Sequence, residues 1–129
     1  MKIAFAAAAV LLSAATPAFA TGGYVCRPVS GAGPSLSVVT GHGVAPVAVS
    51  ATIRDGRRQL SSSGTAPALA VAQSWIDDLD LRLDLVDRNA MRYEARLRAR
   101  FAARSRGRQA LGTLSRNGRV HRVRCEVDG

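Results

Sequence analysis

Lysine is almost missing from this chain: Lys2 is the only one, and the other 17 basic residues are arginines. A GC-rich genome favours arginine over lysine without selection on the protein, so the imbalance alone says little about function. The absence does argue against a phosphate-binding loop. The glycine-rich fragments 31–33 (GAG) and 41–43 (GHG) have no lysine after them and do not lie between a strand and a helix.

Cysteine and histidine are also scarce, with two of each. No pair of them has the spacing of zinc ligands. No G-x-S-x-G elbow frames a serine that His42 or His121 could activate. We therefore expect no metal ion, no cofactor and no catalytic triad.

The only long apolar run lies at the start of the chain. Residues 1–20 (MKIAFAAAAVLLSAATPAFA) carry one positive charge, then an apolar core, then small residues at Ala18 and Ala20. This order is typical of a cleaved export signal, and the apolar core is too short to span a bilayer well. We expect a mature protein that begins near Thr21, has no transmembrane segment and is periplasmic or secreted.

Residues 21–129 are enough for one domain with a modest core and not for two. Cys26 and Cys125 lie near the two ends of this domain, and an even number of cysteines in an oxidising compartment favours a disulfide. In the chain-entropy model, a bridge that closes so long a loop stabilises the fold by about 4–5 kcal/mol. The bridge requires the first and last strands to be neighbours.

The domain reads as all-β, because short segments rich in Val, Ile and Thr alternate with Gly, Pro and Ser. The odd positions of 47–53 (Val47, Val49, Ala51 and Ile53) are expected to face the core. A total of about eight to nine strands predicts a small antiparallel β-sandwich or barrel. The expected strands are 24–28, 35–40, 46–54, 57–62, 66–78, 79–85, 91–101, 109–115 and 120–127.

Two dipeptides, Asp55-Gly56 and Asn117-Gly118, predict tight hairpins because these residues tolerate the positive φ angles of a type I′ turn. If the second closes as a two-residue turn, the two strands beside it share one face. That face would hold Ala110, Gly112, Leu114, His121, Val123 and Cys125.

Residues 79–101 (LDLRLDLVDRNAMRYEARLRARF) require a choice between helix and strand. Their composition favours a helix, but the strict alternation of apolar and charged residues favours a hairpin with odd positions from Leu79 to Phe101 in the core. A three-residue loop at 87–89 would make each cross-strand pair opposite in charge or jointly apolar. The expected pairs are Asp84 with Arg92, Arg82 with Glu94, Asp80 with Arg96, Leu85 with Met91, and Leu83 with Tyr93.

This register leaves five arginines without an acidic residue nearby, and they are the candidate binding residues: Arg98, Arg100, Arg104, Arg106 and Arg108. The arginines of 116–124 would add to them if the last three strands are adjacent. The nearby acidic cluster, 77–87, is interpreted as a solvated, salt-paired face whose pairs each contribute only about 0–1 kcal/mol. The alternative is that the whole arginine run is a solvated surface without a ligand.

The sequence Tyr24-Val25-Cys26 follows the expected cleavage site closely, and the last cysteine stands near the end of the chain. With the export signal and the all-β pattern, this layout resembles the periplasmic inhibitors of C-type lysozyme. The resemblance implies a small secreted β domain. The Ser-Gly and Lys-Gly loop motifs of that family are not recognisable here, so no site residue is carried over.

We therefore expect a non-catalytic binding module of the cell envelope or secreted space, with an arginine-rich face for an anionic lipid, an acidic glycan or an acidic protein. Nucleic acid is disfavoured, because export removes the usual target and few aromatic residues are present for base stacking. Two alternatives remain. One is a small secreted hydrolase that uses loop Asp or His residues, and the other is a structural envelope protein with no dedicated ligand.

Overall fold

The computed structural model describes residues 22–41, 46–105 and 107–128. The expected signal segment lies outside these residues, as do His42 and Arg106. In the part of the chain that is described, no helical segment has the length and apolar character needed to cross a membrane.

Nine antiparallel strands form one continuous sheet, which confirms the all-β prediction. Their order in the sheet is β4-β3-β2-β1-β9-β8-β7-β6-β5. The strands are β1 (Gly22–Pro28), β2 (Ser35–Gly41), β3 (Val47–Asp55), β4 (Arg58–Ser61), β5 (Leu69–Ile76), β6 (Asp80–Asp87), β7 (Tyr93–Phe101), β8 (Gln109–Arg116) and β9 (Arg119–Val127).

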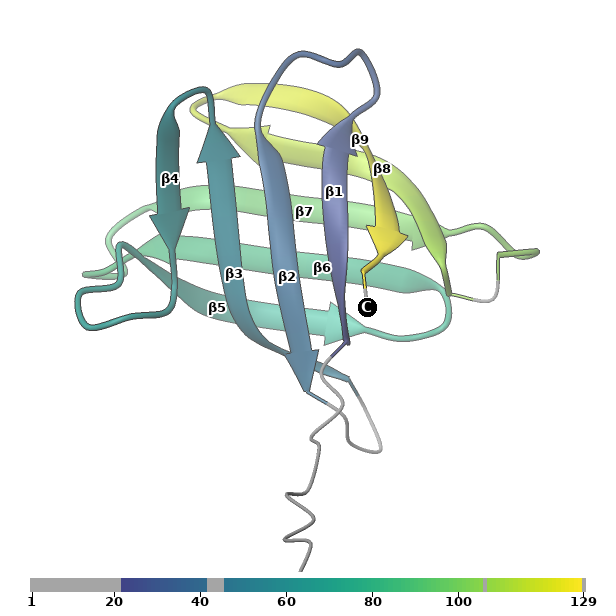
Figure 1. Cartoon of the computed structure of the whole chain (residues 1–129), viewed down its shortest axis with the longest axis horizontal. Helices are drawn as coiled ribbons and strands as arrows, with labels where there is room; N and C mark the ends of the chain where they lie inside the picture. The colour runs from purple at the N-terminus through teal and green to yellow at the C-terminus, as the bar shows by residue number, and fades with distance from the viewer. Residues whose placement is uncertain (1–21, 42–45, 106, 129) are drawn as a thin grey trace, which may run out of the picture.

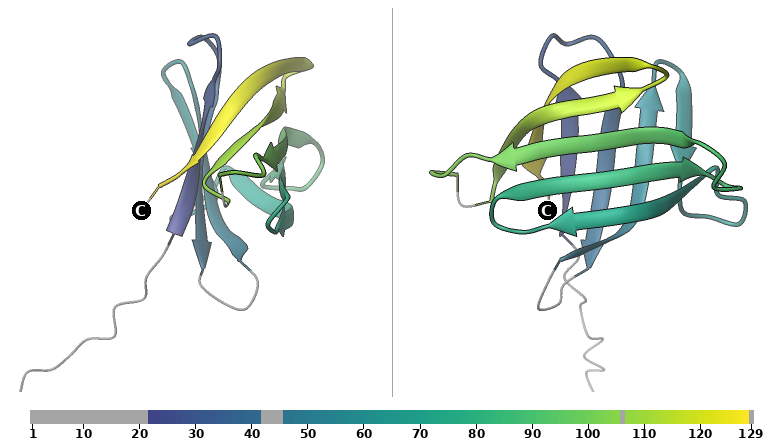
Figure 2. Two further views of the ribbon diagram at one scale, coloured as in Figure 1. Left: turned by 90° about the vertical axis from the view of Figure 1, so that its right-hand side faces the viewer. Right: turned by 180° about the vertical axis from the view of Figure 1, so that it is seen from behind.

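The sheet curls over on itself into a nearly closed barrel (Figure 1). Strands β1–β4 form one layer and strands β5–β7 cross behind them, while β8 and β9 carry the sheet from one layer to the other (Figure 2). The two sheet edges, β4 and β5, do not pair. On that side the Ala48 amide of β3 donates a hydrogen bond to the Ser74 hydroxyl of β5 at 3.2 Å.

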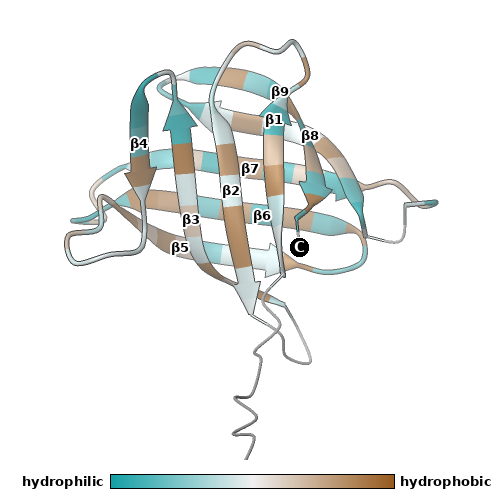
Figure 3. Ribbon diagram, viewed as in Figure 1, coloured by the Kyte–Doolittle hydropathy of each residue, from teal (hydrophilic) through white to brown (hydrophobic). Residues whose placement is uncertain are grey.

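The core lies between the two layers and is built from alternate residues of each strand. The alternation shows as bands of apolar and polar residues along the ribbons (Figure 3). The largest fully buried side chains come from both layers: Leu36, Ile53, Leu69, Leu81, Leu83, Leu85, Leu97, Leu114 and Val123.

The first and last strands pair, and Cys26 lies directly opposite Cys125 in the β1–β9 register. The two cysteines form the predicted disulfide, and both are buried. The bridge therefore joins the two ends of the domain at the seam between β1 and β9.

The two predicted hairpin turns differ in outcome. The turn at Asn117-Gly118 is confirmed, since Arg116 pairs with Arg119 and both turn residues have positive φ. The same register confirms the shared face expected for β8 and β9. The other turn is wrong by one residue: Asp55 pairs with Arg58, so the turn residues are Gly56 and Arg57.

The expectation that Val47 and Val49 face the core is wrong, because both side chains are exposed. The β2–β3 register shifts between Val39 and Thr40, so that Ser50 pairs with Val39 but Ala48 pairs with Thr40. This bulge makes Val49 an extra residue and places Ala48 in the core.

The hairpin predicted for 79–101 forms, but its register differs from the prediction by four residues. Leu83 pairs with Leu97, and Asp84 pairs with Arg96. The loop is longer than expected because the Asp87 carboxylate accepts hydrogen bonds from the amides of Met91 and Arg92, at 2.7 and 3.2 Å.

An even shift keeps residues on their predicted face of the sheet, except beyond the bulge between Leu85 and Val86, where Tyr93 pairs with Val86 and changes face. The core prediction therefore holds from Leu81 to Leu85 and from Ala95 to Phe101. It is wrong for three residues at the ends of the predicted strands, Leu79, Met91 and Tyr93, which are exposed. Met91 is 82% exposed, because it lies in the loop rather than on β7.

Candidate functional site

The outer face of strands β5–β9 carries two parallel rows of side chains that follow the cross-strand register. The first row contains no acidic residue and the second contains one. The first row is Trp75, Arg82, Arg98, Thr113 and Arg122. The second row is Asp80, Arg100, Leu111, Arg124 and, on β1, Arg27. We call the residues Arg82, Arg98, Arg100, Arg122 and Arg124 the arginine face.

Within this face, Arg82 and Arg98 lie directly opposite each other on adjacent strands. Like charges in this position destabilise a sheet. The charge of Arg98 is partly compensated, because its Nη1 lies 2.8 Å from Asp84 Oδ1 and also donates a hydrogen bond to the Leu97 carbonyl oxygen. The charge of Arg82 is compensated less well. Among the described residues its nearest carboxylate oxygen is Asp80 Oδ2, which lies 3.8 Å from Arg82 Nη2, and the Arg82 side chain is 56% exposed.

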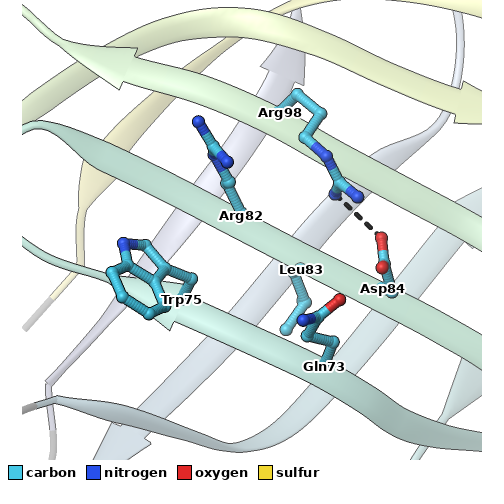
Figure 4. A pocket seen from close by; sticks show the side chains of 6 residues that line it. All are labelled: Gln73, Trp75, Arg82, Leu83, Asp84 and Arg98. Carbon is cyan, nitrogen blue, oxygen red and sulfur yellow. Dashed lines mark ion pairs between the residues drawn. The ribbon is translucent and has the colours of Figure 1, made fainter.

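A hollow of about 120 Å³ lies at the start of the first row, and Figure 4 shows the side chains that line it. Trp75 and Gln73 of β5 border it on one side, and Arg82, Asp84 and Arg98 border it on the other. The indole of Trp75 is 60% exposed, and its Nε1–H donates to Asp77 Oδ2 at 2.9 Å, which fixes the ring. The fixed indole ring of Trp75 and the guanidinium of Arg82, whose charge has little compensation, therefore border the same hollow.

Asp84 lies at the base of this hollow and is 3% exposed. Burial raises the pKa of its carboxyl, but the hydrogen bonds and positive charges of Arg98 and Arg96 outweigh burial and hold the pKa below its ordinary value. Asp84 is therefore ionised at neutral pH and cannot supply a proton there. This state suits a residue that positions Arg98 and does not suit a general acid.

A second, wider hollow continues from the first across β7 to β8. Both hollows are bordered by Arg82 and Arg98, and the second reaches Arg100, Leu111 and Gly112. A third hollow shares Leu111 and Gly112 with the second and extends to Arg122. Together they form one track that crosses the outer face from Trp75 to Arg122.

Gly112 is required where the track crosses β8. A Cβ at this position would collide with the carbonyl oxygen of Arg98 and the Cα of Ala99 on β7. Glycine therefore permits β7 and β8 to approach closely at the point where the sheet passes from one layer to the other.

The structure places the five predicted binding residues in two groups. Arg98 and Arg100 lie on the outer face of β7, as expected. Arg104 and Arg108 are exposed in the loop between β7 and β8, where Arg108 borders a separate hollow beside Glu126. Arg106 lies outside the described residues.

The expectation that Arg98 and Arg100 lack acidic neighbours is wrong. Arg98 contacts Asp84, and Arg100 Nε lies 3.6 Å from Asp80 Oδ1. The four-residue error in register caused this, because it paired Asp84 with Arg92 and Asp80 with Arg96, whereas the structure pairs them with Arg96 and Arg100. The same error concealed Arg82, which had been assigned to Glu94 and instead faces Arg98.

The arginines of the last hairpin also fall into two groups, one exposed and one buried. Arg122 and Arg124 join the arginine face, as expected for adjacent strands. Arg116 is buried and contacts Asp55 and Glu94. It therefore belongs to the structural framework and not to the binding surface.

Several Asp and His residues that the hydrolase alternative could use have other contacts in the structure. Asp80 and Asp84 are each held by arginines. His121 lies on β9, and its ring lies beside Gly33. No group of three or more His, Cys, Asp or Glu side chains suited to a metal ion occurs within 22–41, 46–105 and 107–128.

Comparison of the chain with family models, with curated proteins and with solved structures found no match. The resemblance to the lysozyme inhibitors therefore rests on layout alone. The functional interpretation rests on the geometry of the outer face.

Proposed function

We propose that the protein is a non-catalytic binding module of the cell envelope or secreted space, and that its arginine face holds an anionic partner. The disulfide is compatible with such a location. The observation that carries the proposal is the opposition of Arg82 and Arg98 on adjacent strands. Like charges on directly opposed residues cost stability in the free protein, and an anion that contacts both arginines converts that cost into paired contacts.

Guanidinium groups suit this role because their planar fork matches carboxylate and phosphate oxygens. A charge-assisted hydrogen bond contributes about 1.5–3 kcal/mol, which is at least about a tenfold gain in affinity per arginine. Several such contacts along the track would give useful affinity without a deep pocket.

The test compares two double variants of equal net charge. Arg82→Gln with Arg100→Gln removes two charges from the face, whereas Arg57→Gln with Arg119→Gln removes two exposed charges from hairpin turns. Binding to acidic polysaccharide and to anionic vesicles is measured at low and high salt, since exposed charges are screened within about 8 Å at physiological salt.

The proposal predicts that the wild type and the turn variant bind, that salt weakens both, and that the face variant binds at least tenfold more weakly. Equal binding by the two variants would mean that net charge alone is responsible. Binding by none of the three proteins would favour a structural protein without a ligand.

A further inference from the structure

We infer that the anionic partner is an acidic polysaccharide, with one uronate ring stacked on Trp75 and its carboxylate on Arg82. This inference rests on the proposed function and specifies its ligand class. It combines two features that a sugar acid needs in one place: a flat apolar surface for the ring and a cation for the carboxylate.

Trp75 meets the first requirement. Its side chain is exposed on the outer face of β5, while Ser74 and Ile76 on either side of it turn inward. The hydrogen bond from its indole nitrogen to Asp77 holds the ring in place before any ligand arrives. A ring fixed in this way loses little conformational entropy on binding.

The surrounding side chains meet the second requirement. Arg82 is the register partner of Trp75 on the adjacent strand, and both side chains border the same hollow (Figure 4). Gln73 borders the same hollow and is exposed, which leaves its amide able to reach sugar hydroxyls. The hollow therefore offers a stacking surface, a cation and a neutral hydrogen-bonding group.

The track extends this subsite into a site for a chain. It crosses strands β5 to β9, which lie about 4.8 Å apart, so it is about 19 Å long. Arginines recur along it at Arg82, Arg98, Arg100 and Arg122. These arginines lie on three strands, β6, β7 and β9, so a polymer of acidic sugars laid along the track can bring its carboxylates to more than one of them.

The shape of the face favours a polymer over a membrane surface. Arg98 borders the hollow and is held against the buried Asp84, so its side chain is less exposed (39%) than that of Arg100 (76%), and a strand of sugars can still reach it. A flat bilayer would contact projecting side chains first and leave such a hollow empty. Anionic lipid is therefore an outcome of the test and not the inference.

Trp75 is the only tryptophan in the chain, so its fluorescence reports directly on this site. Polygalacturonate fragments are titrated into the full protein, with the fully methyl-esterified fragments as the uncharged control and phosphatidylglycerol vesicles as the lipid control. The inference predicts a saturable change in emission with polygalacturonate and none with the ester.

Calorimetry with Trp75→Ala then separates this inference from the proposed function. We expect at least tenfold weaker polygalacturonate binding for Trp75→Ala and unchanged binding for Tyr93→Ala, which removes another exposed aromatic side chain that lies under Arg96. Matching far-UV spectra and melting temperatures confirm that each variant is folded.

Three outcomes would overturn the inference. Polygalacturonate binding that Trp75→Ala leaves intact but the Arg82 and Arg100 variant abolishes would keep the proposed function and remove the sugar subsite. Binding to vesicles but not to polygalacturonate would also keep the function and identify lipid as the ligand. Binding to neither would remove both proposals.

Discussion

Arg116 connects the two layers of the barrel and is the residue whose replacement should be most damaging outside the apolar core. Its side chain is 3% exposed. Nε lies 3.0 Å from Asp55 Oδ2 on β3, and Nη1 lies 3.2 Å from Glu94 Oε2 and 3.1 Å from the Glu94 carbonyl oxygen. One guanidinium thus joins β8 to both β3 and β7.

Removal of Arg116 would leave the Glu94 carboxylate, which is 12% exposed, with only the exposed Arg92 as its cationic partner. Breaking a buried ion pair by deleting one partner costs about 3–5 kcal/mol. Asp55 is more exposed and can be solvated, so the lower half of that range applies. A loss of about 3 kcal/mol in a domain of this size should lower the melting temperature by about 12–24 °C.

Arg116→Met tests this estimate because methionine keeps much of the apolar stem but carries no charge. The matched control is Arg119→Met, since Arg119 pairs with Arg116 across the same hairpin but is exposed. Thermal unfolding followed by circular dichroism should show a large decrease for the first variant and a change of a few degrees for the second. Equal melting temperatures for the two would refute the structural role of the Arg116 contacts.

Three further predictions concern the seam, the β7–β8 contact and acid stability. Replacing Cys26 and Cys125 by Ala should lower the free energy of unfolding in urea by about 4–5 kcal/mol, since the bridge spans 99 residues; a change below about 1 kcal/mol would contradict this. Gly112→Ala should cost about 1–3 kcal/mol or more, because its Cβ meets backbone atoms that cannot rotate away, and an unchanged melting temperature would exclude that collision. Asp84→Asn should destabilise the protein at neutral pH but less in acid. The pKa of Asp84 is lowered in the folded protein. The stabilisation from its ionised carboxylate is therefore present above the unfolded pKa of about 3.9 and is lost as pH falls through the folded pKa. A stability difference that does not vary with pH would oppose this assignment.

Most of the fold was predictable from patterns that lie within short stretches of the sequence. β-Forming residues between Gly, Pro and Ser, together with the alternation in 79–101, located each strand to within a few residues, and the Asn117-Gly118 dipeptide fixed the last hairpin and its shared face. The cysteine positions implied that β1 and β9 are neighbours, which the disulfide confirms. These signals need no knowledge of distant contacts.

The register of β6 and β7 was not predictable in this way. Asp84 finds an oppositely charged partner in either register, but Arg82 faces Glu94 in the predicted register and Arg98 in the observed one, so charge pairing favoured the wrong register. The deciding contact is the Asp87 carboxylate on the amide of Met91, a loop interaction with no signature in the alternation pattern.

The bulge at Val49 was not predictable either, since this extra residue looks like part of a regular strand in the sequence.

Only part of the candidate site was predicted from the sequence. Arg98 and Arg100 were identified, but Arg82 was assigned to an acidic partner. Trp75 could have been recognised, because Ser74 and Ile76 on either side of it suit the inner face.

The most direct test of the proposed binding face is nuclear magnetic resonance of the nitrogen-labelled protein during titration with polygalacturonate fragments. The arginine side-chain Nε–H and tryptophan indole signals report on the guanidinium groups and the ring themselves. We predict that the largest shifts belong to Trp75, Arg82, Arg98, Arg100 and Arg122, and that they saturate together. Shifts confined to the β7–β8 loop or to the layer formed by β1–β4, or no shifts at all, would contradict the assignment of the outer face of β5–β9 as the binding surface.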